Sequence, residues 1–333
     1  MTVVVSRRPA MPLTLSAERS WELLDHLHMS YRGPWVVFFS GGKDSTALSL
    51  VLARWSQAKP DLNLTILYID TRIEPPPMHE GALITLEQLR VRYGVGVVVR
   101  RPIPQESFWT LLLGKGYPPP HRKFRWCTDK LKLRPSLRYL KKTQAGLALV
   151  GSRLGESAGR THRLSVSCNV QTGECGTGSL ATTLSTHQMP YAAPLLHWNT
   201  EDVWDYLQTA RIQERLELDH LFDLYGGGDL RFGCWTCSLV KKDRSGMALL
   251  ERGHHVMAPL LAYRSWLIEE AAKTENRYLR QNGIRGRLTL AFRQKAFEQL
   301  KHVETKTGQR WLIREEETLI QRFWKDPRYG PYL

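Results

Sequence analysis

The stretch VVFFSGGKDST, residues 36–46, decides the fold. Its apolar run stops at a serine and two glycines, and the helical pattern ALSLVLARW follows it. Two glycines let a backbone approach an anion closely, the amide groups and dipole of the next helix face that anion, and Lys43 adds a positive charge. The sequence therefore predicts a phosphate-binding loop between a strand at 35–39 and a helix at 45–57.

This loop matches neither of two common nucleotide-binding signatures. It lacks the first glycine of the pattern G-x-x-x-x-G-K-[ST], and it does not fit G-x-G-x-x-G. The alternative is a Gly-Gly turn without a ligand. Strand, loop and helix follow one another in the expected order, and this agreement favours the anion site.

Other apolar runs extend the same pattern along the chain, with expected strands at 64–69, 95–100 and 147–150 and expected helices at 17–30 and 78–93. Strands that alternate with helices indicate an α/β fold, a parallel twisted sheet flanked by helices. Ligands bind at the carboxyl ends of such strands. Ser40, Asp70 and Gly151 stand at these ends, so we expect them near a ligand.

The second half of the sequence differs in composition and in periodicity. Residues 155–190 are rich in Gly, Ser and Thr, which predicts a mobile loop over the site. Helical periodicity returns at 200–208, with Thr200 as the expected N-cap. From 246 to the end the chain reads as helical and basic, and Trp and Tyr are interleaved with the cations.

Composition limits the class of protein. The 333 residues are 42% hydrophobic, and no apolar run has the length of a membrane span. No signal-peptide pattern opens the chain, so we expect a cytoplasmic protein without a membrane partner. The net charge of +15 favours a polyanionic partner, with nucleic acid first. Solubility alone, or a nucleotide substrate alone, is the simpler explanation of this positive charge.

The segment Ser-Gly-Gly-Lys-Asp-Ser closely resembles the loop of the PP-loop ATP pyrophosphatases, of the adenine nucleotide alpha hydrolase-like class. These enzymes cleave ATP between the α- and β-phosphates and usually adenylylate a substrate oxygen. The resemblance implies that the loop holds the pyrophosphate part of ATP together with Mg²⁺, and that Lys43 and Asp44 serve catalysis. The implied loop residues are Ser40, Gly41, Gly42, Lys43, Asp44 and Ser45.

Two further segments are similar to the phosphoadenylyl-sulfate reductase branch of this superfamily, namely YIDTRIEPPP (68–77) and GSRLGESAGR (151–160). The resemblance implies that Asp70 lies near the nucleotide. It also implies that Arg153 and Arg160 face phosphates and that Glu156 orients them. A solvated surface charge is the alternative for each arginine taken alone.

The five cysteines are an odd set, Cys127, Cys168, Cys175, Cys234 and Cys237. An odd number in a cytoplasmic chain argues against a disulfide framework. The C-x-x-C pair at 234 and 237 is typical of zinc sites, iron–sulfur clusters and redox thiols. No second C-x-x-C or histidine pair stands at zinc spacing, although zinc and redox thiols stay open as alternatives.

Segments around these cysteines resemble the ATP pyrophosphatase of DNA phosphorothioation, the Dnd/Ssp-type sulfurtransferase. They are FRWCTDKLKLRP (124–135) and RFGCWTC (231–237), joined by PLLHWNTEDVWDYL (194–207) and LIREEETLIQRFWKDP (312–327). The resemblance runs from about 17 to 328. It implies an iron–sulfur cluster, of the 4Fe–4S type, on Cys127, Cys234 and Cys237, with Cys127 and Cys237 in the catalytic set.

The fourth ligand of such a cluster is open. The family carries a further cysteine shortly before RFGCWTC, where this chain has Gly226, Gly227 and Gly228. Either Cys168 or Cys175 supplies the fourth ligand, or one iron is left open to hold sulfur; our hypothesis is the open iron. GECGTG (173–178) is similar to the Glu-Cys-Gly of the reductases, but there the cysteine lies on the C-terminal tail, and here some 158 residues follow it.

The resemblance implies three regions, a helical lead-in (1–34), a PP-loop domain with the cysteine site (35–245) and a basic helical region (246–333). It implies ATP-dependent sulfur insertion into the DNA backbone, with a cysteine desulfurase and other phosphorothioation subunits as partners. Sulfonucleotide reductase, tRNA thiolase and a nucleotide-binding subunit without chemistry are the alternatives. The expected DNA contacts lie in one basic stretch, at Arg277, Arg280, Arg285, Arg287, Arg293 and Lys295.

Overall fold

The computed structural model describes residues 13–154, 180–181, 189–226 and 230–331. The chain divides into two compact units, and each unit is assembled from three separate stretches. Unit 1 consists of Met1–Tyr68, Met78–Val99 and Arg138–Asp229, and unit 2 of Ile69–Pro77, Arg100–Leu137 and Leu230–Leu333. Each unit thus draws residues from more than one of the regions expected from the sequence, and the boundaries at 34/35 and 245/246 stay a prediction.

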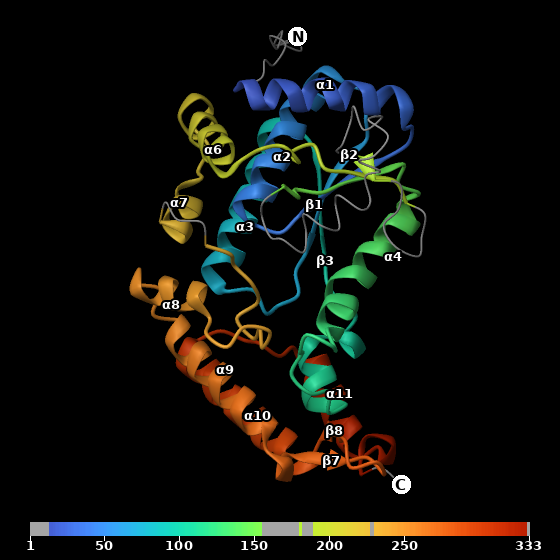
Figure 1. Cartoon of the computed structure of the whole chain (residues 1–333), viewed down its shortest axis with the longest axis vertical. Helices are drawn as coiled ribbons and strands as arrows, with labels where there is room; N and C mark the ends of the chain where they lie inside the picture. Colours follow the sequence, from blue (N-terminus) through green and yellow to red (C-terminus); the bar gives the residue numbers. More distant parts are fainter. Residues whose placement is uncertain (1–12, 155–179, 182–188, 227–229, 332–333) are drawn as a thin grey trace, which may run out of the picture. The chain divides into compact units, whose positions relative to one another are not determined.

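Unit 1 is built on a six-stranded sheet in the order β3-β2-β1-β4-β6-β5 (Figure 1). Five strands run parallel, and the edge strand β5 pairs antiparallel with β6. The strands are β1 (Trp35–Phe39), β2 (Leu64–Ile69), β3 (Gly96–Arg100), β4 (Leu147–Leu149), β5 (Leu180–Ala181) and β6 (Tyr191–Ala192). The α/β class and the four strands expected from the sequence are confirmed.

The centre of the sheet is apolar because it is covered on both faces. β1 pairs with β2 from Trp35↔Leu64 to Phe39↔Tyr68, and with β4 from Trp35↔Leu147 to Val37↔Leu149. Buried parallel strands read as continuous apolar runs, and WVVFF is one of them. The helices in chain order are α1 (Leu15–Ser30), α2 (Lys43–Trp55), η1 (Ser56–Ala58), α3 (Pro76–Tyr93), α4 (Arg134–Thr143), α6 (Thr200–Glu214) and α7 (Asp219–Tyr225).

Two local details differ from the sequence-based expectation. The proline-rich stretch 74–77 does not stay outside the following helix, because α3 begins at Pro76, where a missing N–H costs nothing. The N-cap of α6 is Asn199 rather than Thr200. Its side chain accepts from the Asp202 backbone N–H, and the Asp202 carboxylate accepts from the Asn199 N–H in return, which forms a capping box.

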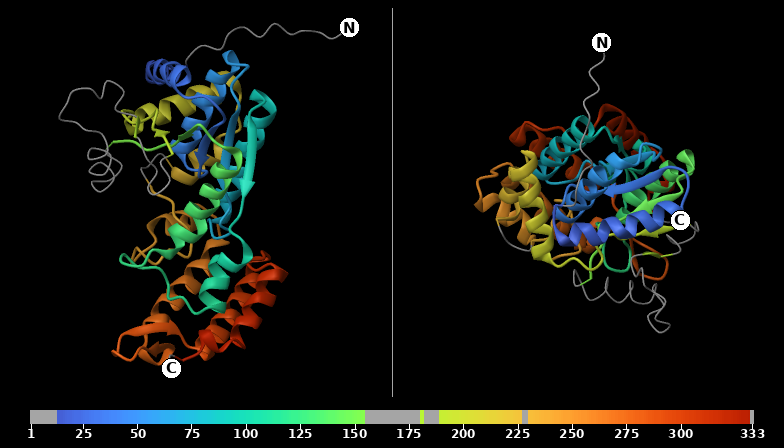
Figure 2. Two further views of the ribbon diagram at one scale, coloured as in Figure 1. Left: turned by 90° about the vertical axis from the view of Figure 1, so that its right-hand side faces the viewer. Right: turned by 90° about the horizontal axis from the view of Figure 1, so that it is seen from above.

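Unit 2 contains the helical C-terminal region, drawn in orange and red in Figure 2. Its helices are η2 (Pro104–Glu106), α8 (Arg244–Glu251), α9 (Met257–Ala272), η7 (Thr274–Asn276), α10 (Leu290–Thr307), α11 (Arg314–Trp324) and η8 (Pro327–Tyr329), with two π-helices, η3 (Thr110–Gly114) and η4 (Thr128–Leu133). The stretch 277–288 is not helical, because β7 (Arg277–Leu279) and β8 (Arg285–Leu288) form an antiparallel hairpin between α9 and α10.

The core of unit 2 is aromatic. Trp235 is fully buried, and its ring lies 5.1 Å from that of Trp311 and 5.7 Å from that of Trp109. Tyr263 of α9 completes this group, with its ring 6.0 Å from Trp109. Within the part of the chain that the structure describes, no helix is long and apolar enough to cross a membrane.

Candidate functional site

The phosphate loop of unit 1 has a shape that only glycines allow. Gly41 has a φ of +80°, and a Cβ atom there would lie 2.8 Å from the Cβ of Ala82. Gly42 is the N-cap of α2, and a Cβ there would lie 3.1 Å from the Tyr225 hydroxyl. The backbone therefore runs tightly from β1 into α2, as the sequence predicts.

Two serines brace the loop from within. The backbone N–H of Ser40 donates to Oγ of Ser45 at 3.1 Å, and that hydroxyl donates to the carbonyl of Gly42 at 2.9 Å. The two hydroxyl oxygens also lie 3.1 Å apart. These bonds hold the loop in its turn between β1 and α2.

Lys43 and Asp44 open the first turn of α2. Lys43 is 3% exposed, and its Nζ lies 3.5 Å from Oδ2 of Asp44 and 5.1 Å from the centre of the Tyr225 ring. The backbone N–H of Lys43 donates to the Tyr225 hydroxyl at 3.3 Å. Tyr225 was not expected at the site. Its position at the end of α7, far along the sequence, gave no local signal.

Arg153 reaches the same loop from the segment after β4. Its Nε donates to Oδ1 of Asp44 at 2.5 Å, and its Nη1 donates to the Trp198 carbonyl at 3.2 Å. Gly151 allows this approach, since a Cβ there would lie 3.1 Å from the Asp44 carbonyl oxygen. Arg153 thus stands at the predicted loop, where it is only 4% exposed and bonded to Asp44. Glu156 and Arg160 lie outside the described residues.

Asp44 is the acid of the loop that fits Mg²⁺. Magnesium in nucleotide sites is held by one or two carboxylates together with substrate phosphates rather than by a protein cage. Both Asp44 oxygens face cations here, Lys43 and Arg153, so a metal would compete with them for this carboxylate. A bound nucleotide would bring the remaining oxygen ligands with it.

Asp70 belongs to unit 2 and directly follows β2. The residue is 2% exposed. Its Oδ2 accepts from Nε of Arg101 at 2.7 Å, and its Oδ1 accepts from the backbone N–H of Arg72 at 3.0 Å. Both carboxylate oxygens are therefore used inside unit 2, and Asp70 holds the turn after β2.

The two predicted cysteine segments come together in unit 2. Cys127 is the N-cap of the π-helix η4, and Cys234 and Cys237 form a turn closed by a backbone hydrogen bond of 2.9 Å. Three contacts fix the C-x-x-C turn. The Trp235 N–H donates to the Ile73 carbonyl at 3.0 Å, the Arg264 Nε donates to the Cys237 carbonyl at 2.8 Å, and the Ser238 hydroxyl donates to the Pro120 carbonyl at 2.5 Å.

All three thiols are free and partly exposed. Burial raises the pKa of Cys234 to about 12, and it raises the pKa of Cys127 against a hydrogen bond from Thr128. The pKa of Lys132 is raised chiefly by Cys234, with smaller effects of Glu74, Cys127 and Cys237. Lys132 is thus the cation of this cysteine site, which the sequence reading missed.

The π-helix explains why Lys132 lies near Cys127. Its hydrogen bonds run from residue i to i+5, as the Arg134 N–H to the Asp129 carbonyl shows. Residues five apart therefore lie above one another, whereas an α-helix would turn them to different faces. Lys132 stands five residues after Cys127.

The chemistry of the donor set fits an iron–sulfur cluster, which cysteine thiolates hold. Among the described residues, no three His, Cys, Asp or Glu side chains are gathered round one point as a single metal ion needs. Sulfurs on one zinc ion stand about 3.8 Å apart, from tetrahedral Zn–S bonds of about 2.3 Å, whereas the ligands of a cluster bind different irons. Cys168 and Cys175, the candidates for a fourth ligand, lie outside the described residues.

The basic residues expected to contact DNA are largely engaged within unit 2. Arg293 is 1% exposed, and its guanidinium donates to the carbonyls of Gly114 and Tyr329. The prediction that Arg293 contacts DNA is therefore wrong, because its side chain is buried. The others lie on the hairpin and on α10. Arg277 donates to the Gly286 carbonyl and Arg285 to the Ala272 carbonyl, Arg287 lies over the Tyr329 ring, and Lys295 pairs with Glu270 and lies over the Trp266 ring.

Arg280 also makes an interaction within the protein. An engaged cation can still meet a phosphate, so the prediction of a DNA contact stands for these residues. The hairpin itself is nevertheless held by the cations that were expected to face outward.

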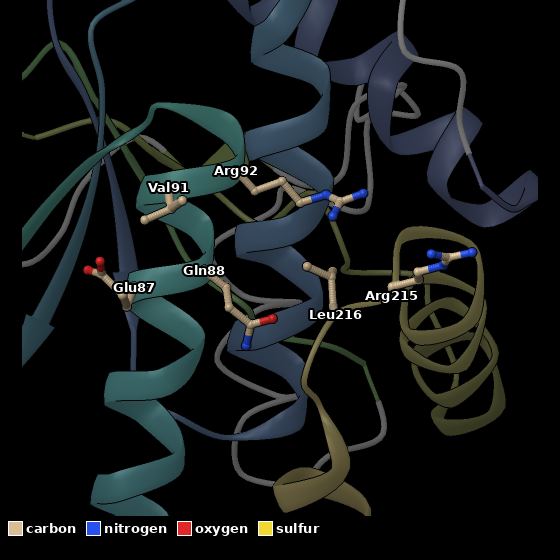
Figure 3. A pocket seen from close by; sticks show the side chains of 6 residues that line it. All are labelled: Glu87, Gln88, Val91, Arg92, Arg215 and Leu216. Carbon is tan, nitrogen blue, oxygen red and sulfur yellow. The ribbon is translucent and has the colours of Figure 1, made fainter.

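A small pocket of about 230 Å³ lies elsewhere in unit 1. Figure 3 shows that its labelled side chains come from α3 and from the residues just after α6. They are Glu87, Gln88, Val91, Arg92, Arg215 and Leu216. None of the predicted site residues lines this pocket, so we assign it no part in the chemistry.

Comparison with known proteins supports the sequence reading at the level of the family. Residues 34–240 match the phosphoadenosine phosphosulfate reductase domain. An uncharacterized protein of Methanocaldococcus jannaschii is 29% identical over 210 residues, which are 62% of this chain and 37% of that protein. The match thus spans little more than a third of the length of that relative.

Solved structures that resemble the chain include three kinds of protein. Phosphoadenylyl-sulfate reductase from Candida auris is 15% identical with a TM-score of 0.45, over 66% of this chain and 90% of the other. A tRNA thiolase from Methanococcus maripaludis with its [4Fe-4S] cluster is 14% identical with a TM-score of 0.41, over 76% and 78%. Ammonia-dependent NAD synthetase from Campylobacter jejuni is 14% identical with a TM-score of 0.40, over 79% and 96%.

The family match covers well over half of the chain, including the phosphate loop, Arg153 and all of the cysteines. The chain therefore belongs to the phosphoadenosine phosphosulfate reductase domain family, within the PP-loop superfamily.

Proposed function

We propose that this protein uses ATP to activate a phosphate of the DNA backbone and then replaces one of its oxygens with sulfur. The observation that carries the proposal is that the segment of Cys127 and the turn of Cys234 and Cys237 come together in unit 2, where the Ser238 hydroxyl donates to the Pro120 carbonyl. The same chain also has the Ser40–Ser45 phosphate loop. Phosphate activation and sulfur handling are the two chemistries that a phosphorothioating enzyme needs.

The first step is adenylylation. A non-bridging oxygen of the DNA phosphate attacks the α-phosphorus of ATP, and pyrophosphate leaves. The loop amides and Lys43 are suited to the charge that develops on the departing pyrophosphate, since oriented donors stabilise such charge without reorganising. Asp44 would hold Mg²⁺, which neutralises charge between the phosphates. Arg153 keeps the Asp44 carboxylate oriented.

The second step is displacement. Sulfide attacks the activated phosphorus, a P–S bond forms, and AMP leaves with the original oxygen. A cysteine desulfurase would supply the sulfur as a persulfide, so two electrons from a reductant are needed to release it as sulfide. An iron–sulfur cluster on the three cysteines would supply redox chemistry and a binding place for sulfur. Lys132 places a positive charge where anionic sulfur would be held.

Pyrophosphate release from ATP tests the first half of the proposal. Lys43→Ala should lower the rate at least about 100-fold, the scale seen when an oriented transition-state donor is lost. Lys141→Ala is the matched control, because this exposed lysine on α4 lies outside the loop. Equal rates in wild type and Lys43→Ala would contradict the assignment of the loop.

The cysteines are tested by iron content and visible absorbance after anaerobic preparation. Cys127→Ser, Cys234→Ser and Cys237→Ser should each lose the cluster, and Cys175→Ser should keep it if three cysteines suffice. Loss of the cluster in Cys175→Ser would favour four ligands. Zinc in place of iron in the wild type would overturn the cluster.

Mass spectrometry of nuclease-digested DNA from the source strain tests the whole reaction. Phosphorothioate dinucleotides should be present with the wild type and absent with Lys43→Ala and with Cys237→Ser. If the wild type yields none, thiolated nucleosides in tRNA and reduction of sulfonucleotides by thioredoxin are the next assays, since a tRNA thiolase and a sulfonucleotide reductase share the same loop.

A further inference from the structure

The surface beside the cysteine site carries a compact group of cations and one exposed ring. Residues 121–125, which we call the basic turn, read His-Arg-Lys-Phe-Arg and are all exposed. Phe124 is 42% exposed, and it is the one aromatic ring among the exposed large hydrophobic side chains of the described residues. The turn ends two residues before Cys127, on the same segment of unit 2.

The basic turn is held in a fixed shape. The Phe124 N–H donates to the His121 carbonyl at 2.8 Å, and the His121 N–H donates to the Phe124 carbonyl at 3.3 Å. Below it, Trp126 is 4% exposed and donates to the Pro118 carbonyl at 2.9 Å. The Ser238 hydroxyl bonds to the Pro120 carbonyl, so the turn is tied directly to the residue after Cys237.

Phe124 is part of a small aromatic platform. Its ring centre lies 6.0 Å from that of His121 and 6.1 Å from that of Tyr117. Tyr117 in turn meets the buried Trp126 edge-on at 5.6 Å. An exposed ring supported from the side and from below loses little freedom when a base stacks on it, and stacking on such rings is how proteins hold unpaired bases.

The three cations of the turn have no acidic partner among the described residues. Within the described ranges, the side chains of Arg122, Lys123 and Arg125 make no hydrogen bond or ion pair. Two later cations of the same segment do have an acidic partner, since Glu106 pairs with Lys130 at 3.3 Å and with Arg134 at 2.7 Å. Arg277 and Arg285 of the hairpin, by contrast, donate to carbonyls of their own unit.

We propose that the basic turn binds single-stranded DNA, with Arg122, Lys123 and Arg125 on backbone phosphates and a base stacked on Phe124. The inference rests on the proposed function, because it supplies the contact that brings a DNA phosphate to the cysteine site. Unpaired bases are the expected partner because a stacking ring flanked by cations is the usual arrangement for single strands, whereas duplex bases are already stacked.

Fluorescence anisotropy with a labelled 20-nucleotide DNA of mixed sequence tests this surface. Arg122→Ala, Lys123→Ala and Arg125→Ala together should weaken binding of the full chain at least about tenfold at low salt, and should reduce the slope of log K against log salt by about 2, at roughly 0.7 per phosphate contact. The matched control removes three exposed cations of unit 1, with Arg19→Ala, Lys141→Ala and Lys142→Ala. It should stay within about threefold of wild type.

Phe124→Ala separates stacking from charge. It should weaken binding about 5- to 150-fold, the range for loss of one stacked base, without changing the salt slope. The turn residues are exposed, so these variants should fold normally, which thermal melting checks. A triple variant that binds with the wild-type slope, tighter binding to duplex than to single-stranded DNA, or binding to RNA but not to DNA would each overturn the proposal.

The same proteins distinguish this proposal from the proposed function. If the turn variants bind like wild type while DNA from the Lys43→Ala strain loses its phosphorothioates, the surface is wrong and the function stands. If the turn variants lose DNA binding but no phosphorothioate is found with wild type, the surface stands and the sulfur chemistry must be sought elsewhere.

Discussion

Nε of Arg153 donates a 2.5 Å hydrogen bond to Oδ1 of Asp44, across 109 residues of sequence. The resemblance implied that this arginine faces a phosphate and that this carboxylate serves catalysis in the pyrophosphate-holding loop. In the structure the two side chains neutralise each other, and Arg153 also donates a hydrogen bond to the Trp198 carbonyl. Arg153 thus fixes the position of the Asp44 carboxylate in the loop.

Arg153→Ala should therefore lower stability as well as activity. It leaves the Trp198 carbonyl without its donor and Asp44 with one fewer cation, which should cost about 1–3 kcal/mol of unfolding free energy. Urea unfolding checks this, with Arg19→Ala, an exposed arginine of α1, as the control. A variant that keeps full stability and only binds ATP more weakly would show that Arg153 acts on phosphate alone.

Gly41→Ala should lower stability more than the same substitution at another glycine with a similar backbone conformation. Gly41 has a φ of +80° and Gly94 a φ of +67°, but only at Gly41 would the new Cβ meet another atom, Ala82 Cβ at 2.8 Å. Gly94→Ala should lose about 1 kcal/mol through backbone strain alone. Gly41→Ala should lower the free energy of unfolding by at least about 1 kcal/mol more than Gly94→Ala does. It should also abolish pyrophosphate release. Equal losses in the two variants would mean that the tight turn is not required.

Arg293→Met should destabilise the protein without changing how DNA binding depends on salt. The substitution keeps apolar bulk but leaves the buried carbonyls of Gly114 and Tyr329 unpaired, at a cost of about 2–4 kcal/mol. Arg287→Met, next to the Tyr329 ring, should cost less than about 1 kcal/mol. Denaturant unfolding and the salt slope of DNA binding together decide between a structural and a phosphate-binding arginine.

His220 should make unit 1 less stable in acid. Burial lowers the pKa of His220, against opposite effects of Asp219, Asp223 and Glu217, and its Nε2 lies 3.1 Å from the Thr85 hydroxyl. The unfolded chain then binds a proton near pH 6.5 that the folded chain resists. Stability is therefore lost as pH falls below that value, by up to about 1.4 kcal/mol per pH unit from this site.

His220→Gln should flatten this dependence. The measurement is the free energy of unfolding at pH 7.5 and at pH 5.5 for both proteins, and the loss between the two should be smaller in the variant. The same loss in both would assign the acid sensitivity to other groups.

The sheet and the phosphate loop could be predicted because their signals are local. β1 is a continuous apolar run, and residues 40–45 carry glycines, hydroxyls and a lysine in direct succession. The hairpin at 277–288 was misread as helix, because its short strands lack a clear alternation and basic residues are common in helices. Local propensity does not report a pairing of strands this short.

The burial of single side chains and the type of a helix were the other features that the sequence could not predict. Nothing in the sequence marks Arg293 as buried, because the carbonyls that receive it, of Gly114 and Tyr329, belong to distant segments. Lys132 was missed because the usual helical spacing turns residues five apart to different faces, and only the π-helix returns it to Cys127. The cysteine segments themselves were identified by resemblance, and the structure adds the contacts that hold them.

The interleaved construction of the two units has a consequence for synthesis. The chain passes between them five times, and unit 2 is completed only by its last stretch, Leu230–Leu333. Until the ribosome delivers that stretch, Arg72 lacks Glu316, and the carbonyls of Leu113 and Gly114 lack Trp324 and Arg293. The cysteine site thus cannot form on the nascent polypeptide before the third stretch of unit 2, which carries Cys234 and Cys237, has been synthesised. A translation product truncated before Leu230 would carry Cys127 on an unfinished surface.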